Sequence, residues 1–286
     1  MKRELDIVII SDVHLGTYGC HAKELLAYLK SIKTEMLILN GDFIDIWQFR
    51  KSYFPREHMM VVQQILRMAA KGVKVYYITG NHDDALRRYS DFSSGNVHLR
   101  DKLVLQLRDK RYWIFHGDVF DASVQYSRWV ARLGGKGYDY LILLNRFINK
   151  IRELLGMSKM SFAKKVKASV KEAVKFIGDF EATAVELAAR QGYDYVVCGH
   201  IHQPQMKSVS QDGRRITYMN SGDWVESLTA LEYQWGSWSI YEYDESHYQR
   251  DNAKSGGEPA DKNEEFDEDA LREKKLSLDS FFRLGE

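Results

Sequence analysis

Short apolar runs alternate with amphipathic stretches over roughly the first 120 residues of the chain. The apolar runs are nearly continuous and rich in Val, Ile and Tyr, which is typical of strands that helices cover on both faces. The stretches between them repeat their apolar positions with a helical period. The pattern therefore predicts strands at residues 5–10, 36–39 and 73–78, with helices at 21–33 and 57–71 between them.

The second half of the chain is organised differently. Residues 112–115 and 194–198 have the same strand character, but residues 121–191 between them carry helical periodicity and no convincing strand. We expect this segment to be a helical insertion over a core domain that spans residues 1–245. Charged residues dominate residues 246–286, which predicts a mobile tail.

Polar residues follow directly on each of the five clearest predicted strands. In open α/β sheets, ligands collect beyond the carboxyl ends of the strands, so we expect these side chains to converge on one crevice. A single Asp after a strand would be weak evidence, because Asp is common in turns and helix caps. The same arrangement at five strand ends favours a site. These residues are Asp12, His14, Asn40, Asp42, Asp45, Asn81, His82, Asp83, His116, Asp118, His200 and His202.

The spacing of these residues indicates metal ligands. Residues two positions apart on an extended segment point to the same side, so Asp12 with His14, and His200 with His202, can each face a common centre. A mixture of carboxylate, imidazole and amide oxygen suits Mn²⁺, Zn²⁺ or Fe²⁺ better than Ca²⁺, which prefers oxygen ligands alone. The number of ligands fits two ions that share one carboxylate.

The ordered blocks D-x-H, G-D-x-x-D, G-N-H-[ED], H and G-H-x-H occupy residues 12–202, and this set resembles the calcineurin-like metallophosphoesterase superfamily. Within it, the blocks at residues 11–16, 41–47, 115–118 and 220–225 resemble the UDP-2,3-diacylglucosamine hydrolase branch. The similarity covers about residues 5–245. It implies an α/β fold, a four-layer αββα sandwich with an inserted helical lid.

The resemblance also implies roles for individual residues. Two divalent cations are expected. Mn²⁺ is the expected metal, and Zn²⁺ and Fe²⁺ are the alternatives. His82 would lie beside the metals, where it would stabilise transition-state charge or protonate the leaving oxygen, with Asp45 or Asp83 orienting its ring. The best-known members of the branch carry Arg at this position. By the same resemblance, Asp12, His14 and His202 hold one metal, Asn81, His116 and His200 hold the other, and Asp42 bridges them.

The predicted insertion offers a clue to the substrate. It is locally basic, and its cationic residues alternate with apolar ones, so one face could lie in a lipid headgroup layer or accept acyl chains. The alternative is the solvated face of an ordinary packed lid. Aromatic and basic residues near the strand-end loops either line the substrate cleft or pack the rim of the loops. The candidate substrate-binding residues are Trp47, Arg50, Arg87, Arg88, Lys164, Lys167 and Lys171.

Composition narrows the class of protein. Lys and Arg total 41 against 40 Asp and Glu, so no strong overall field favours nucleic acid as a partner. Two cysteines are too few for a disulfide framework, and no apolar run approaches the roughly 20 residues that span a bilayer. We therefore expect a cytoplasmic protein, with a further expectation of peripheral contact with the anionic inner face of the plasma membrane.

These observations favour hydrolysis of a phosphoanhydride or phosphodiester, with the pyrophosphate of UDP-2,3-diacylglucosamine or a similar nucleotide-linked amphiphile as the expected substrate. One alternative is a metallophosphoesterase for a soluble phosphodiester or nucleotide. A second alternative, of another class, is a scaffold that keeps the fold without catalysis.

Overall fold

The computed structural model describes residues 2–46, 53–123 and 162–247, with the side chains of residues 121–123 and 162–173 excepted. Met1–Tyr243 form one compact unit, and Asp244–Glu286 form a second. Among the described helices, none is long and apolar enough to cross a membrane.

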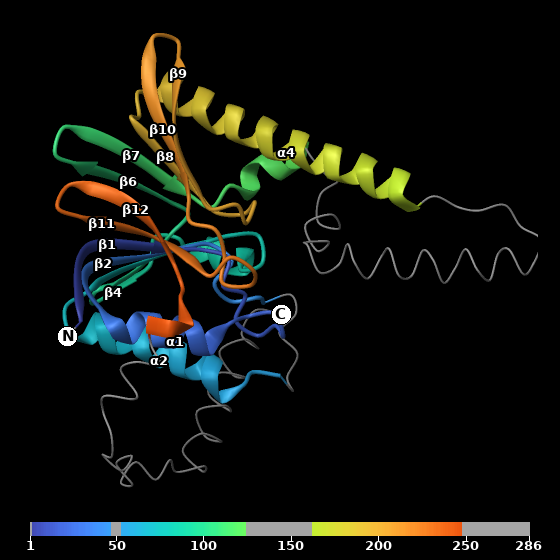
Figure 1. The fold of residues 1–286 in the computed structure, drawn as a ribbon. Helices are drawn as coiled ribbons and strands as arrows, with labels where there is room; N and C mark the ends of the chain where they lie inside the picture. Colours follow the sequence, from blue (N-terminus) through green and yellow to red (C-terminus); the bar gives the residue numbers. More distant parts are fainter. Residues whose placement is uncertain (1, 47–52, 124–161, 248–286) are drawn as a thin grey trace, which may run out of the picture. The chain divides into compact units, whose positions relative to one another are not determined.

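The first sheet has seven strands in the order β12-β11-β1-β2-β3-β5-β4 (Figure 1). β1, β2, β3 and β5 are parallel, whereas β11, β12 and β4 run antiparallel to their neighbours. Its parallel strands therefore end at one common edge. The strands are β1 (Arg3–Ile10), β2 (Ile32–Asn40), β3 (Lys74–Ile78), β4 (Ser93–Ser94), β5 (Val97–Arg100), β11 (Thr229–Gln234) and β12 (Ser237–Glu242).

The second sheet has five strands in the order β6-β7-β8-β10-β9. Its central strands β7, β8 and β10 are parallel, and the two outer strands are antiparallel to them. The strands are β6 (Lys102–Leu107), β7 (Lys110–Phe115), β8 (Tyr195–Cys198), β9 (Gln205–Gln211) and β10 (Arg214–Asn220).

Alternation along each strand separates the layers. Ile9 and Ile38 of the first sheet meet Ile114 and Val197 of the second in one buried cluster between the sheets. Their neighbours in sequence point to the opposite faces. Because side chains alternate across a strand, both faces of each sheet are buried, which explains the nearly continuous apolar runs.

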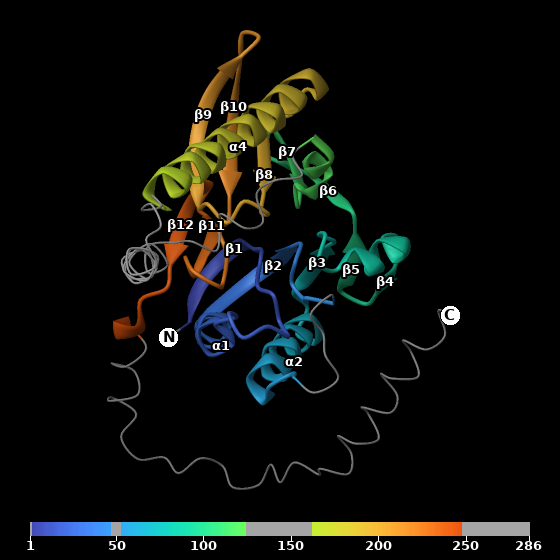
Figure 2. The same ribbon diagram turned by 90° about the vertical axis from the view of Figure 1, so that its right-hand side faces the viewer.

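Helices cover the two outer faces (Figures 1 and 2). α1 (Ala22–Ser31) and α2 (Arg56–Ala70) pack on the first sheet, and α4 (Phe162–Gln191) packs on the second. Two short 3-10 helices, η1 (Asp84–Tyr89) and η2 (Asp118–Ser123), follow β3 and β7. The layers are helix, sheet, sheet and helix, so the predicted αββα architecture is confirmed.

Two predicted boundaries were wrong. The first helix ends at Ser31 instead of residue 33, and β2 begins at Ile32 instead of residue 36. Ile32 and Thr34 are buried while Lys33 and Glu35 are exposed, which is the period of a strand. Over so few residues this alternation also fits the end of an amphipathic helix.

The C-terminal part of the predicted helical insertion at 121–191 is present as α4, but part of this helix has a different place from the expected lid. Phe176, Phe180, Ala184 and Ala188 are buried against the second sheet. From Phe176 onward, α4 is therefore the fourth layer of the sandwich. Residues 124–161 of the predicted insertion and the tail beyond residue 247 lie outside the described residues.

Candidate metal centre

The polar residues after β1, β2 and β8 lie in loops that are hydrogen-bonded to one another. The Asp12 N–H donates to the Gly41 carbonyl (3.1 Å). The His14 N–H donates to the Asp42 carbonyl (2.9 Å). The His200 N–H, from the second sheet, donates to the Asp12 carboxylate (3.0 Å to Oδ2). These bonds hold the strand ends of both sheets together.

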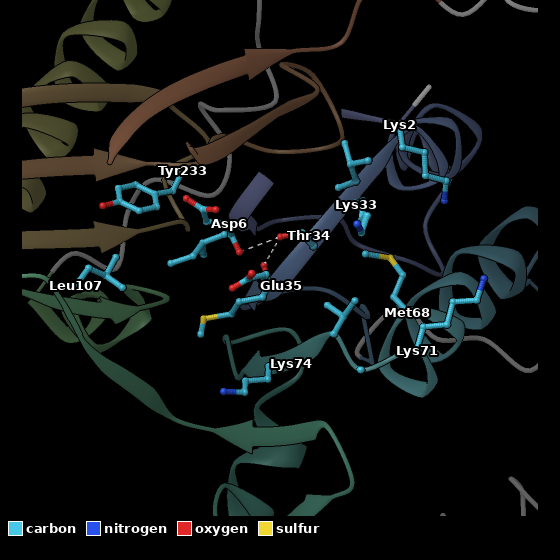
Figure 3. Close-up of a pocket in the computed structure, with 15 residues that line it drawn as sticks. Lys2, Asp6, Lys33, Thr34, Glu35, Met68, Lys71, Lys74, Leu107 and Tyr233 are labelled. Carbon is cyan, nitrogen blue, oxygen red and sulfur yellow. Dashed lines mark hydrogen bonds between the residues drawn. The ribbon is translucent and has the colours of Figure 1, made fainter. Parts of the chain in front are cut away.

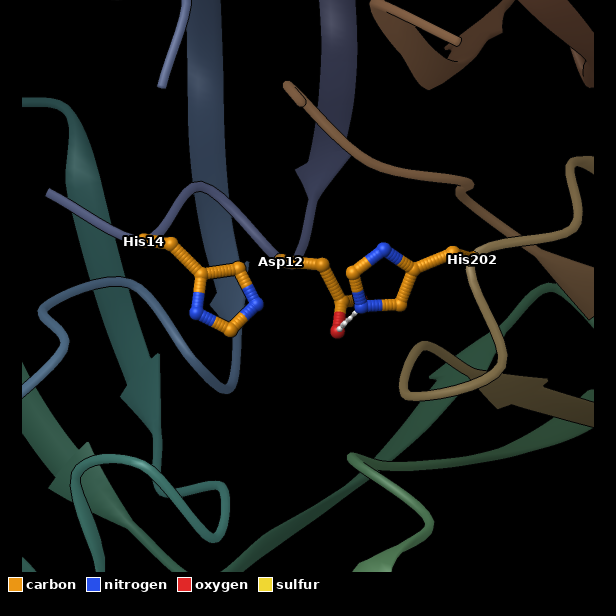
Figure 4. A group of neighbouring side chains, drawn as sticks. All are labelled: Asp12, His14 and His202. Carbon is orange, nitrogen blue, oxygen red and sulfur yellow. Dashed lines mark ion pairs between the residues drawn. The ribbon is translucent and has the colours of Figure 1, made fainter. Parts of the chain in front are cut away.

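In the part of the chain that the structure describes, three groups of three side chains could each hold a cation: Asp12 with His14 and His202, Asp42 with His116 and His200, and His14 with Asp45 and His82. Within each group, the potential ligand atoms lie within 4.8 Å of one another. Figure 4 shows the first group, with the His202 ring pointing at the Asp12 carboxylate and the two joined by an ion pair (Nε2 to Oδ1, 3.2 Å).

Asp42, a member of the second group, also approaches the first group. Its Oδ2 is 3.3 Å from Nε2 of His116 and 3.9 Å from Nε2 of His14. The neighbouring loop also approaches it, because the His82 N–H donates to its Oδ1 (2.7 Å). Asn81 directly precedes His82 in this loop. The structure thus brings the seven predicted metal ligands to one edge of the sandwich; their role as ligands stays a prediction.

The backbone at these positions is strained. Nine non-glycine residues of the described chain have positive φ, and five of them are candidate ligands. Left-handed backbone costs a non-glycine residue on the order of 1–3 kcal/mol and concentrates at functional sites. The five are Asp12 (52°), His14 (53°), Asp42 (52°), His200 (68°) and His202 (55°).

Glycines let the carboxylates approach the backbone. A Cβ on Gly80 would lie 2.3 Å from Oδ1 of Asp42, and a Cβ on Gly199 would lie 2.6 Å from Oδ2 of Asp12. Both distances are far below van der Waals contact, so a side chain at either position would push a carboxylate out of place. The Gly of the G-N-H and G-H-x-H blocks is therefore part of the centre.

Three of the histidines have Nδ1 close to an oxygen outside the centre, and Nε2 of each lies toward a carboxylate inside it. Such an outer partner fixes the ring and leaves Nε2 available as a ligand. The pairs are His116 Nδ1 with the Asn40 carbonyl (2.9 Å), His14 Nδ1 with Asp45 Oδ2 (3.4 Å) and His202 Nδ1 with Asp223 Oδ2 (3.3 Å).

The centre stabilises positive charge. Burial by itself would raise the pKa of Asp12, but His202 and His116 beside it lower that pKa to about 2. The pKa of Asp42 is also lowered. Burial by itself would raise this pKa, but the neighbouring histidines, chiefly His116, lower it. Conversely, burial by itself would lower the pKa of His116, but Asp42 and Asp12 raise it to about 10. These buried carboxylates stabilise the protonated histidines, and the same negative charge favours the binding of cations.

The donor set fits a pair of divalent metal ions. Nε2 of His116 is buried and has no hydrogen-bond partner among the described residues, although a buried ring nitrogen normally has one. Carboxylate and imidazole together match Mn²⁺, Zn²⁺ or Fe²⁺. A cation between His116 and Asp42 would satisfy this nitrogen.

His82 lies at the open side of the centre. Its Nδ1 is 2.9 Å from Asp45 Oδ2, and its Nε2 is 4.0 Å from Asp42 Oδ2. Its ring packs edge-on against His14, with 4.7 Å between the ring centroids. Of the two carboxylates predicted to orient His82, Asp45 lies against its ring.

Asp83 takes a different position from the one predicted. Its carboxylate accepts hydrogen bonds from the Tyr77 hydroxyl (2.6 Å) and from the N–H groups of Gly80 (2.6 Å) and Phe43 (3.0 Å). Burial and the neighbouring Asp42 raise its pKa. Asp83 therefore joins the loops after β2 and β3 beneath the centre.

The predicted substrate-binding residues are only partly described. Arg87 is half-buried and paired with Asp118 (2.7 Å) and Asp101 (2.8 Å), so carboxylates already occupy its guanidinium. Arg88 is exposed and lies over the ring of Tyr89. The other candidates lie outside the described side chains: Trp47, Arg50, Lys164, Lys167 and Lys171.

A groove of about 770 Å³ lies at the other end of the parallel strands (Figure 3). It is lined by the beginnings of β1 and β2, including Asp6 and Thr34, and by the end of α2, including Lys71. It contains none of the strand-end residues predicted as ligands.

The sequence prediction missed Asp223, which approaches His202. It belongs to the block at residues 220–225 that carried part of the resemblance, but no role was assigned to it. The available sequence signal was a carboxylate inside a block that the resemblance had already singled out.

Comparison with known proteins supports the interpretation of this site. A family model described as calcineurin-like phosphoesterase matches residues 5–204. A UDP-2,3-diacylglucosamine hydrolase from Aliivibrio fischeri is 24% identical over 242 residues, which is 83% of this chain and 98% of that protein. One from Nitrosococcus oceani is 28% identical over 230 residues, covering 78% and 88%.

Among solved structures, an archaeal phosphodiesterase aligns over 82% of this chain and 98% of its own, with 14% identity and a TM-score of 0.41.

Proposed function

The chain belongs to the calcineurin-like phosphoesterase family, and we propose that it is a dinuclear-metal hydrolase that cleaves the pyrophosphate of UDP-2,3-diacylglucosamine or of a similar nucleotide-linked amphiphile. The family predicted from the motif blocks is confirmed, and with it the class of enzyme, a hydrolase that acts on phosphate esters or anhydrides.

The observation that carries the proposal is the position of Asp42. Its Oδ2 lies 3.3 Å from Nε2 of His116, in its own group, and 3.9 Å from Nε2 of His14, in the group of Asp12. We assign Asp12, His14 and His202 to one cation, Asn81, His116 and His200 to the other, and Asp42 to both. When bound, two such cations activate water near neutral pH and neutralise charge on phosphoryl oxygens. Mn²⁺ is the proposed metal.

The protein supplies the remaining chemistry through His82. Oδ2 of Asp45 lies 2.9 Å from Nδ1 of the His82 ring and is placed to orient it. Nε2, when protonated, lies at the open side of the centre, where its proton can be given to the oxygen that leaves phosphorus. We propose His82 as the catalytic acid and Asp45 as the residue that orients it.

The choice of substrate rests on the relatives and on two exposed apolar side chains. The two relatives described above bear the name of UDP-2,3-diacylglucosamine hydrolase and match this chain over most of their length. Val119, three residues after His116, and Val174 on α4 are 59% and 65% exposed. Exposed apolar side chains suit a substrate with acyl chains, and we propose that the enzyme binds this substrate at a membrane surface.

An activity panel with added Mn²⁺ tests the proposal. UDP-2,3-diacylglucosamine, its acyl-free analogue, a simple phosphodiester and a simple phosphomonoester would be compared at equal concentration. We expect UMP and a lipid phosphate from the diacylated substrate, and much slower cleavage of the others. Equal cleavage of the acyl-free analogue would contradict the lipid substrate and favour a soluble nucleotide. No cleavage of any compound would favour the non-catalytic scaffold.

A further inference from the structure

We infer that Asp223 is a positioning residue that fixes the ring of His202 with its proton on Nδ1 and its Nε2 directed at the metal centre. This inference rests on the metal-dependent function proposed above. His202 comes from the loop before β9, and Asp223 comes from the loop between β10 and β11. Their contact joins two loops that the sequence separates by about 20 residues.

The two oxygens of Asp223 have different partners. Oδ1 accepts three backbone hydrogen bonds, from the N–H groups of Val225 (2.8 Å), Glu226 (2.6 Å) and Ser227 (3.0 Å). Three N–H donors hold this oxygen in one position. Oδ2 is buried and lies 3.3 Å from Nδ1 of His202. The carboxylate is therefore oriented by its own loop before it meets the histidine.

The loop that carries Asp223 is fixed to the centre by its backbone. The Trp224 N–H donates to the Asp12 carbonyl (3.1 Å). The Trp224 side chain is fully buried and packs against Tyr28, with 5.4 Å between the ring centroids. Asp223 is thus anchored to the same segment that supplies Asp12, which would bind the same cation as His202.

The direction of the His202 ring follows from these contacts. Nε2 lies 3.2 Å from Oδ1 of Asp12, inside the centre, while Nδ1 faces Asp223. A histidine binds a metal through an unprotonated nitrogen, so its proton must be on the other one. A carboxylate facing Nδ1 stabilises that tautomer, and such outer partners commonly contribute about 10- to 100-fold in metal affinity.

The test compares Mn²⁺ binding by the metal-free full-length chain and by the Asp223→Asn variant, using isothermal titration calorimetry. The amide oxygen of Asn can still accept the three backbone N–H groups, but its NH₂ then faces Nδ1 and favours a proton on Nε2 instead. We expect the affinity of one of two Mn²⁺ sites to fall about 10- to 100-fold.

Ser227→Ala is the matched control, because the Ser227 hydroxyl accepts the Asp223 N–H (3.1 Å) and its loss loosens the same loop without touching the carboxylate. We expect it to bind Mn²⁺ like wild type. If both variants lost affinity in proportion to a fall in Tm, the role of Asp223 would be merely structural. Unchanged affinity in Asp223→Asn would also overturn the inference.

A spectrum of the wild-type chain makes the test independent of variant folding. With Zn²⁺ bound, long-range ¹H–¹⁵N correlation should place the His202 proton on Nδ1, and a proton on Nε2 would overturn the inference. A wild-type chain that binds no Mn²⁺ would overturn both this inference and the proposed function. Binding without hydrolysis of any phosphoester would overturn only the latter.

Discussion

The two ends of the parallel strands in the first sheet hold opposite kinds of site. At the carboxyl ends, the carboxylates of Asp12 and Asp42 are buried among histidines on left-handed backbone. At the amino ends, a groove of about 770 Å³ is lined by ionisable side chains that are exposed, such as Lys33 and Lys74. Of the residues that line the groove, only Gly72 has positive φ.

The difference separates open volume from burial and backbone strain, which occur at opposite ends of the strands. Charged groups taken out of water must be compensated, and a strained backbone persists only where surrounding contacts enforce it. The groove has neither feature, because its charges remain solvated. We therefore expect substitutions at the two ends of the strands to differ by orders of magnitude in their effect on hydrolysis.

The largest effect is expected for Asp42→Ala. Removing this carboxylate eliminates the proposed ligand of both cations and leaves buried histidines without their anionic partner. We expect hydrolysis to fall at least about 10³-fold, which corresponds to several kcal/mol of transition-state stabilisation. Bound metal should fall in parallel, as measured by elemental analysis. The control is Asp194→Ala, a carboxylate away from the centre that pairs with Lys110 (3.2 Å); near-equal losses in both variants would contradict the assignment.

His82→Ala should separate catalysis from metal binding. Loss of a general acid typically lowers kcat by about 10²–10⁴-fold, whereas the seven proposed ligands remain. We expect metal content close to wild type together with a loss of the basic limb of the pH profile. Metal loss as large as that of Asp42→Ala would show that His82 is a ligand instead.

The metal-free protein should be most stable in mildly acidic solution. The pKa of Asp12 is lowered from 3.8 to about 2, so its contribution is present above pH 3.8 and is lost as the pH falls toward 2. The pKa of His116 is raised from 6.5 to about 10, so its contribution is complete below pH 6.5 and is lost as the pH rises through 10. We expect Tm after chelation to peak between these limits. A Tm that kept rising from pH 6.5 to 10 would contradict the charge assignment.

Metal affinity should rise at alkaline pH, where the Tm of the metal-free protein is expected to fall. A cation must displace the protons that His116 and His202 carry in the metal-free protein, so binding should tighten as the pH rises from about 6 toward 10. Proton release measured in weakly and strongly buffered calorimetry would test this. Binding without proton release would place the ions elsewhere.

The smallest effect is expected at the groove. Lys33 is 72% exposed and pairs with Glu4 on the surface (3.0 Å), a kind of contact that contributes little to stability. Lys33→Ala should change the free energy of unfolding by less than about 0.5 kcal/mol and leave kcat unchanged. A clear loss of activity would show that the groove contributes to hydrolysis and would contradict the difference proposed between the two ends of the strands.

The family resemblance was sufficient to predict the four layers, and the pattern of apolar runs was sufficient to predict which strand ends carry the candidate ligands. The continuous apolar runs predicted strands buried on both faces, and the structure has Val8 and Ile10 on one face and Ile7 and Ile9 on the other. The polar residues followed where the apolar runs stopped. The sequence was not sufficient for α4, because an amphipathic helix presents the same pattern whether it covers a cleft or a sheet. The burial of Phe176 against the second sheet decides between them for that part of the helix.

Contacts between distant loops were the other limit. Asp83 and Asp45 both follow predicted strands, and only the folded loops show that Asp45 faces His82 while Asp83 binds Tyr77 and two backbone N–H groups. Asp223 meets His202 only because β10 is paired between β8 and β9. Such partners depend on strand order, which local patterns do not encode.

The most direct test of the central claim is a crystal structure of the full chain with Mn²⁺, with anomalous scattering used to locate the ions. We predict two anomalous peaks at the carboxyl ends of the strands, with Asp42 in contact with both. A single peak, or peaks at the exposed carboxylates of the groove such as Asp6 and Glu35, would contradict it.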